Sequence, residues 1–446
     1  MSNEQTGKNK RYEAEKRQYE LEGELETLLS RRSLLVRGGT GVAVLGGLGA
    51  LLGENAAAAT PRTLAAVEAA AAWTPARIKA KYGSTTYGDS WHSPALAILA
   101  DRAAGGTVAA KQMGQKYRGI SSDFDSVKQI SNVQNAINAG MKVINTVPLE
   151  ATNANAIDAA AKGRALFTTS YNSPAWKTPL DYGSEYVTYF APDDRNTGRL
   201  MARNLAKNLK GKGNIVHLEG LAGATASVLR SAGVDEVLKK EFPGVKLAAR
   251  VNTNWTATDA QAKMQNLLSS VGQIDGVIGQ DDDLGIGAYN AIRIAGKEIP
   301  VVSNDGVKQA FELINSSFYL GTVNAFSHWI GGYALVRLFD ALHGWKPAPS
   351  ERMMFWQTSW TDKTSATKYL KAFWSGNNPY NYTKMSRVLS PTDWDTQQQL
   401  RPMDPNYIWG GEPKPGSYKL PAGYDKKSLA KTNALYQAHW KTRTFA

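Results

Sequence analysis

The sequence predicts an α/β fold with two lobes, each built on a parallel sheet that is covered by helices. Short apolar segments alternate with longer amphipathic segments from about residue 80 to residue 342. The glycine-rich stretch 211–213 interrupts this alternation and divides it into two runs, each of ordinary domain size. Repeated strand–helix units form parallel sheets through right-handed crossovers, so two runs predict two sheets.

The expected elements follow one another along the chain. In the first run we expect strands at residues 80–86, 117–121, 142–147, 165–170 and 186–190. Helices are expected at 94–113, 125–139 and 154–162, with a fourth that ends at residue 210. The second run predicts strands at 214–218, 246–251, 276–279, 301–303 and 321–323. Its helices, which show apolar residues at helical spacing, are expected at 227–241, 258–271, 284–295, 307–315 and 328–342.

Polar residues stand where three predicted strands of the second run end. The strand at 276–279 is followed by three carboxylates at 281–283, and the strand at 301–303 by Asn304, Asp305 and Gly306. The strand at 214–218 runs into the glycine-rich turn EGLAG. In an open parallel sheet, ligands bind outside the carboxyl ends of the strands. Three strand ends of one type therefore predict one shared binding crevice.

Composition excludes several classes of site. The chain has 446 residues, 42% of them hydrophobic, and no cysteine, which excludes disulfides, thiolate metal ligands and a cysteine nucleophile. The net charge is +13, but no Lys/Arg run longer than two follows residue 59, and neither a helix-turn-helix nor a zinc-ligand spacing is present. We therefore expect a solvated basic surface and no nucleic-acid partner.

Residues 1–59 resemble a twin-arginine export signal. Arg31 and Arg32 precede an apolar, glycine-interrupted run at 36–52, and four alanines follow at 56–59. A membrane anchor is the alternative, but such a run is marginal for crossing a bilayer. We expect a periplasmic protein exported by the twin-arginine route, with no lipid anchor because no cysteine is available. Residues 1–59 are excluded from the predicted fold.

Residues 345–446 differ in character from the two runs. Seven of the 12 tryptophans of the chain lie here, among prolines, glycines and tyrosines, without a repeat period. We expect an irregular, aromatic-rich C-terminal extension that packs on the lobes. An aromatic platform for a carbohydrate or a partner protein is the alternative.

Five segments together carry a family resemblance. They read DDRNTGRLMA, GKGNIVHLEGLAGATASVLRSAG, NTNWTATDAQAKMQNLL, DGVIGQDDDLGIGAYNAIRIAG and VVSNDG. In this order the chain resembles the periplasmic sugar-binding proteins of ABC importers, which include ribose, galactose and xylose binders, over about residues 76–345. The resemblance implies the type I periplasmic binding protein fold, with two Rossmann-like lobes joined by a hinge. The expected lobes are 76–211 with 326–344, and 212–325, and the hinge is expected near 211–213, Asn324 and the segment after Gly344.

The resemblance also implies a function without catalysis, metal or cofactor. A monomer of this type captures a sugar or polyol between its lobes and delivers it to the permease of an ABC transporter. LacI-type repressors share the two-lobed core, but an export signal stands here in place of their helix-turn-helix. A ligand-binding component of a sensory or chemotaxis receptor is an alternative. A carbohydrate-active enzyme is another, with paired carboxylates or an Mg²⁺ or Ca²⁺ site at 281–283 and Asp305.

The resemblance assigns eight ligand-binding residues. They are Trp91, Asn172, Asp193, Arg230, Trp255, Asp281, Asp305 and Asn324. Aspartate accepts hydrogen bonds from sugar hydroxyls, arginine offers a fork of donors, and tryptophan covers an apolar sugar face. Tyr87 and His92 are further candidates in the first lobe.

Each assignment has a structural alternative. The aspartates at 193, 281 and 305 could cap the helices that follow them. Arg230 could pair with Glu219 or Asp235, and Trp255 could be core.

Overall fold

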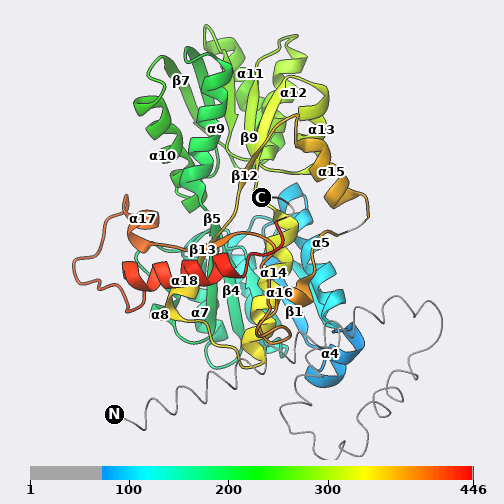
Figure 1. Cartoon of the computed structure of the whole chain (residues 1–446). Coiled ribbons are helices and arrows are strands. Elements are labelled where there is room, and N and C mark those ends of the chain that lie inside the picture. Colours follow the sequence, from blue (N-terminus) through cyan, green and yellow to red (C-terminus); the bar gives the residue numbers. More distant parts are fainter. Residues whose placement is uncertain (1–72, 377, 444, 446) are drawn as a thin grey trace, which may run out of the picture. The chain divides into compact units, whose positions relative to one another are not determined.

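The computed structural model describes residues 73–376, 378–443 and 445 (Figure 1). The predicted export signal therefore lies outside the described residues. Contacts group residues 72–446 into one unit, within which two sheets define two lobes. In the described part of the chain, no helix has the length and apolar character needed to cross a membrane.

The first lobe is built on a seven-stranded sheet with the order β13-β11-β5-β4-β3-β1-β2. Its strands are β1 (Thr86–Trp91), β2 (Lys116–Ser121), β3 (Val143–Thr146), β4 (Leu166–Ser170), β5 (Tyr186–Pro192), β11 (Met353–Trp356) and β13 (Leu400–Pro402). All pair in parallel except β13, which is antiparallel to β11. Its helices are α4 (Pro75–Tyr82), α5 (Ala97–Gln112), α6 (Ser126–Asn138), α7 (Asn153–Ala161), α8 (Pro179–Tyr182) and α14 (Ser327–Leu342).

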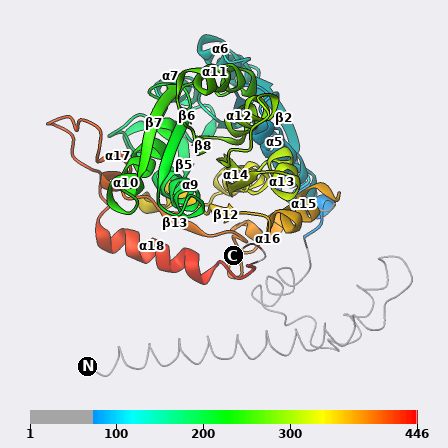
Figure 2. The ribbon, with the colours of Figure 1, turned by 90° about the horizontal axis from the view of Figure 1, so that it is seen from above.

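The second lobe is built on a six-stranded sheet with the order β12-β10-β9-β8-β6-β7. Its strands are β6 (Gly213–Glu219), β7 (Val245–Asn252), β8 (Gly276–Gly279), β9 (Val301–Asp305), β10 (Tyr319–Asn324) and β12 (Ser359–Thr361). Only β12 is antiparallel. Its helices are α9 (Asp194–Asn208), α10 (Thr225–Lys240), α11 (Ala257–Ser270), α12 (Asp282–Ile294), α13 (Lys308–Ser316) and α15 (Ala366–Trp374). Figure 2 shows these helices around the sheet, so the predicted two-lobed α/β class is confirmed.

The first predicted strand is wrong. Residues 75–82 form α4, whose start is marked by Thr74, which accepts a hydrogen bond from the Arg77 amide, and by Pro75 in the first turn. The strand begins only at Thr86 and ends at Trp91. Trp91 is consequently a strand residue instead of part of the loop that follows.

The boundary between the lobes also differs from the expected residue 211. Helix α9 packs on α10 and on β8, β9 and β10, so the chain enters the second lobe already at Asp193. It returns after Asn324 and crosses again between β11 and β12. Gly211 and Gly213 lie inside the second lobe, where both adopt a positive φ.

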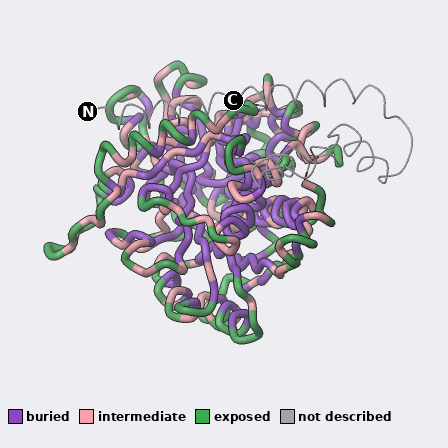
Figure 3. The backbone as a smooth tube through the Cα atoms, turned by 60° about the horizontal axis from the view of Figure 1, so that its bottom comes forward, coloured by how far each residue is buried: buried purple, intermediate pink, exposed green. Residues whose placement is uncertain are grey.

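The C-terminal extension is part of both lobes instead of an irregular covering. It adds β11 and β13 to the first sheet and β12 to the second, and α15 packs on α13. It also contains the short helices η2 (Pro349–Glu351), α16 (Tyr382–Met385) and α17 (Pro405–Trp409), followed by α18 (Lys426–Ala438). Every residue of α14 from Ser327 to Asp340 is buried. Figure 3 shows that buried segments gather in the interior and that exposed segments lie at the periphery. A helix that is buried on all sides needs cover on all sides, and α5 and α16 both pack against it.

Reciprocal glycine contacts hold one helix pair in each lobe. A Cβ atom on Gly105 of α5 would lie 1.9 Å from the His328 carbonyl oxygen, and one on Gly331 of α14 would lie 2.0 Å from that of Arg102. In the second lobe, a Cβ on Gly198 of α9 would lie 2.0 Å from the Arg230 carbonyl oxygen of α10. Larger residues would force the backbones apart, so the glycines fix how closely the helices approach.

Candidate ligand-binding site

A cavity of about 70 Å³, with room for several water molecules, lies where the carboxyl ends of the two sheets face each other. Both lobes line it. The lining residues are His92, Leu96, Ile98, Leu99, Val147, Tyr171, Asn172, Ala224, Ala226, Arg230, Trp255, Asp281 and Asp305. Five of the eight predicted site residues are among them, and they come from three strand ends, one helix and the loop after β7. The arrangement is that of a ligand site at the switch points of parallel sheets.

Two carboxylates form the acidic side of this cavity. Asp281 is the N-cap of α12, where its Oδ1 accepts a hydrogen bond of 2.7 Å from the Leu284 amide. Asp305 ends β9 with a φ of 133°, and its Oδ1 accepts a hydrogen bond of 2.7 Å from Asn304 Nδ2. Such a backbone angle is strained for a residue with a side chain, and strain of this kind concentrates at functional sites. Each carboxylate keeps its second oxygen without a hydrogen bond to any described residue.

Arg230 is held by an ion pair behind the cavity wall. Its Nε donates to Asp194 Oδ1 at 2.7 Å, and its Nη1 donates to the Gln280 carbonyl oxygen at 2.7 Å. Arg230 does not pair with Glu219 or Asp235, which were the structural partners expected from the sequence. The pair leaves Nη2 of the guanidinium for a ligand.

Trp255 closes the second-lobe side of the cavity. It lies in the turn between β7 and α11 with a φ of 67°, and its ring lies over Gly220, where any Cβ atom would come within 1.9 Å of the ring. The guanidinium carbon of Arg230 lies 5.9 Å from the centre of this ring. Gly220 therefore makes room for a flat aromatic wall.

The first lobe supplies polar atoms and an apolar surface. Asn172 Nδ2 donates to the carbonyl oxygens of Pro148 at 2.8 Å and Leu149 at 3.2 Å, which leaves its buried Oδ1 without a partner. The buried Nε2 of His92 also has no partner. Leu96, Ile98, Leu99 and Val147 provide the apolar part of the lining.

Three predicted residues lie outside this lining. Trp91 packs over Gly119 in the first lobe, because β1 ends later than expected. Asp193 caps α9 through the Asn196 amide and accepts hydrogen bonds from Tyr407 and Arg401 of the extension. Asn324 accepts a hydrogen bond of 2.8 Å from the Phe326 amide, which shapes the crossing after β10. Each of the three has a structural role in these positions.

The middle carboxylate of the acidic stretch supports the fold. Asp282 accepts hydrogen bonds from the Gly306 and Val307 amides at 2.8 Å each, from Thr322 Oγ1 at 2.7 Å and from Ser303 Oγ. It thereby ties the ends of β9 and β10 to the start of α12. In the described residues, no group of three or more His, Asp or Glu side chains is arranged to hold a metal ion.

Burial dominates the electrostatics of the site. It raises the pKa of Asp281 and that of Asp305 well above the ordinary aspartate value, and Asp283 and Asp281 respectively add to these shifts. Burial also raises the pKa of Asp283 to about 7 and lowers that of His92 to about 4. At neutral pH His92 is therefore uncharged, and the two lining carboxyls hold protons more tightly than ordinary aspartates do.

Tyr171 was missed as a lining residue. It has a φ of 68°, and its ring makes an edge contact with Trp356 of the extension at 5.3 Å between ring centres. The sequence did contain a signal for this residue, because Tyr171 stands at a strand end, directly after β4 and directly before the predicted site residue Asn172. The apolar wall had no sequence signal, because leucine and isoleucine at the start of a helix, and valine at the end of a strand, are typical of a protein core.

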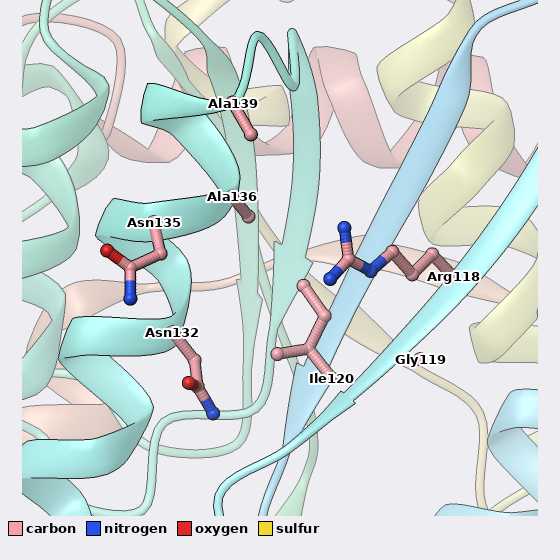
Figure 4. A pocket seen from close by; sticks show the side chains of 7 residues that line it. All are labelled: Arg118, Gly119, Ile120, Asn132, Asn135, Ala136 and Ala139. Carbon is pink, nitrogen blue, oxygen red and sulfur yellow. The ribbon is translucent and has the colours of Figure 1, made fainter.

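A larger hollow of about 460 Å³ lies between β2 and α6 (Figure 4). Arg118 projects from β2, the edge strand, and Asn132 and Asn135 come from α6. It lies away from the strand carboxyl ends, and no predicted site residue lines it. We therefore place the candidate site in the smaller cavity, where buried charges and unpartnered polar atoms converge.

The ion pair predicts that Arg230 supports the fold, whereas the lining carboxyl of Asp305 does not. Arg230→Ala leaves Asp194 buried without its partner, which typically costs about 3–5 kcal/mol of folding free energy. Asp305→Asn keeps the shape of the side chain, and asparagine tolerates the same backbone angle. The substitution removes one of the two neighbouring carboxyls. We expect denaturant unfolding to show a large loss of stability for Arg230→Ala and none for Asp305→Asn. Equal stability of Arg230→Ala and the parent protein would contradict the supporting role of the pair.

The comparisons with known proteins agree with this topology. The model of the family described as periplasmic binding protein domain matches residues 85–345. The xylitol-binding protein of Mycolicibacterium smegmatis is 36% identical over 204 residues, which cover 45% of this chain and 56% of that relative. The chain thus spans little more than half the length of that protein. The ribose import binding protein of Bacillus subtilis is 28% identical over 239 residues, 53% of this chain and 75% of its own.

A solved structure is also similar to this chain over most of its own length. The twin-arginine translocation pathway signal protein from Burkholderia phytofirmans superposes with a TM-score of 0.63 and 28% identity over 67% of this chain and 96% of its own. The family match extends over more than half of the chain and over both sheets. The chain therefore belongs to the periplasmic binding protein family.

Proposed function

We propose that this chain is the extracytoplasmic solute-binding component of an ABC importer, and that it captures a small sugar or polyol between its two lobes. The observation that carries this proposal is the cavity at the facing strand ends, which combines Asp281, Asp305 and Arg230 with the ring of Trp255. Relatives named as xylitol- and ribose-binding proteins support it. The same comparison supports binding without chemical conversion.

The chemistry of the lining suits a polyol. Carboxylates accept hydrogen bonds from hydroxyl groups, and a guanidinium fixed by an ion pair donates to hydroxyl oxygens in one orientation. The indole ring of Trp255 offers a flat surface for C–H groups. A ligand with hydroxyls on one side and C–H groups on the other satisfies both kinds of lining.

Contacts across the rim of the cavity support a closing motion. The backbone of Ala97, at the start of α5, lies close enough to Asp283 of α12 to lower the pKa of its carboxyl. His328 of α14 stacks on Phe373 of α15, with 5.0 Å between ring centres. These contacts join different lobes, and contacts of this kind can separate when the lobes rotate about the crossings.

The periplasm is the proposed location, and delivery of the ligand to a membrane permease the proposed partnership. Family membership and Arg31-Arg32 before a weakly apolar run support export by the twin-arginine route. We propose that the protein acts as a monomer.

The export route can be tested in the twin-arginine motif. Changing both Arg31 and Arg32 to lysine keeps the charge but removes the paired guanidinium groups. We expect the variant precursor to remain in the cytoplasm, as measured by cell fractionation. Export at the parental level would contradict the twin-arginine route.

The binding proposal is tested by calorimetric titration with pentitols, aldopentoses and hexoses. Trp255→Ala removes the flat wall of the cavity, and loss of an aromatic contact surface of this size is worth about 1.5–3 kcal/mol. We therefore expect the best ligand to bind about ten- to a hundredfold more weakly. Trp440→Ala, which changes a tryptophan outside the cavity lining, serves as the matched control and should bind as the parent does. If both variants bind equally well, the ligand does not lie in this cavity.

A further inference from the structure

The charges that line the cavity do not balance. Arg230 is neutralised by Asp194, which lies 2.7 Å from it, and both side chains are at most 3% exposed. Asp281 and Asp305 have no cationic partner within ion-pair distance among the described residues, and no lysine lines the cavity. Closing the lobes therefore buries two neighbouring carboxyls whose charges repel one another.

The unpartnered atoms of the lining are largely hydrogen-bond acceptors. Asn172 is 6% exposed, and its Oδ1 has no partner because its amide nitrogen already donates to two backbone carbonyls. His92 is uncharged at neutral pH, so one of its two ring nitrogens carries a lone pair, and its buried Nε2 has no partner. The second oxygens of Asp281 and Asp305 add two more acceptors.

An ammonium group matches both features. It supplies three donors, no acceptor and one positive charge. A hydroxyl group could donate to the same oxygens, but a neutral ligand would leave the two buried charges uncompensated unless a carboxyl took up a proton. The rings of Trp255 and Tyr171, which also line the cavity, attract a cation through their faces.

We propose that the ligand of this site is an amino-substituted polyol, whose ammonium group lies against Asp281 and Asp305. This inference rests on the proposed function, because it names the ligand class of the same cavity. The hydroxyls of such a ligand meet Arg230 and Asn172, and its carbon skeleton lies against Trp255 and the apolar wall of the first lobe.

The test compares xylitol with a panel of amino-deoxy pentitols that carry the amine on successive carbons. We expect at least one amino-pentitol to bind the wild-type protein ten times more tightly than xylitol at pH 7. Titrations in buffers of different ionisation enthalpy should show uptake of about one proton with xylitol and little with the amine.

Two variants sharpen the comparison. Asp281→Asn leaves one carboxyl in the cavity, so the preference for the amine should fall at least tenfold, with weaker amine binding and stronger xylitol binding. Asp235→Asn changes an exposed carboxylate of α10, whose side chain is 54% exposed, and should leave the preference unaltered. The same loss of preference in both variants would mean that net charge, and not the cavity, attracts the amine, and would overturn the proposal.

The remaining outcomes separate the two proposals. If xylitol or another neutral polyol binds as tightly as every amino derivative, the amine proposal is wrong, whereas the solute-binding function stands. If the folded protein binds neither amino nor neutral polyols and sugars, the proposed function fails together with this inference.

Discussion

The buried ion pair between Arg230 and Asp194 is the constraint on which the candidate site depends. It joins α10 to the start of α9, at the point where the chain first enters the second lobe, and the Gln280 carbonyl at the end of β8 fixes the guanidinium from a third element. The close approach of α9 and α10 at Gly198 keeps the partners within reach. Because Asp194 already neutralises Arg230, the carboxyls of Asp281 and Asp305 are left to the ligand. One ion pair thus determines both the geometry and the charge of the cavity.

The C-terminal extension adds a second constraint, because it ties the lobes and the crossings together. Arg401 and Tyr407 of the extension bind Asp193, the residue next to Asp194. Inside the first lobe, Arg337 donates to Tyr436 of α18 at 2.7 Å and to the Glu351 carbonyl oxygen at 3.0 Å, so the extension is anchored by buried polar contacts. Its strands β11 and β12 belong to different sheets and are separated by only two residues. Movement between the lobes must therefore pass through this short connection as well as through the crossings at Asp193 and Asn324.

The sequence predicted the alternation of strands and helices because buried parallel strands and amphipathic helices leave clear local patterns. It also predicted that Asp281, Asp305, Arg230, Trp255 and Asn172 would face one crevice, and they line one cavity; whether they bind a ligand stays a prediction. Trp91 was misplaced because a capped helix with Pro75 in its first turn was read as a strand, which moved the expected strand end forward. The strands of the extension could not be predicted from local sequence patterns, because they have only three or four residues and pair with partners far away in sequence. Asp193 shows the remaining limit, since capping and ligand binding use the same residue type.

The central claim, that the two lobes close over a ligand, is tested most directly by electron–electron distance measurement. The chain contains no cysteine, so spin labels can be attached at Val127→Cys on α6 and Ile294→Cys on α12, which are 72% and 61% exposed and belong to different lobes. With a saturating ligand whose binding has been shown by calorimetry, we expect one narrow distribution of distances. Without ligand, we expect a broader distribution that extends to longer distances. Identical distributions in the two states would contradict closure of the lobes over the cavity.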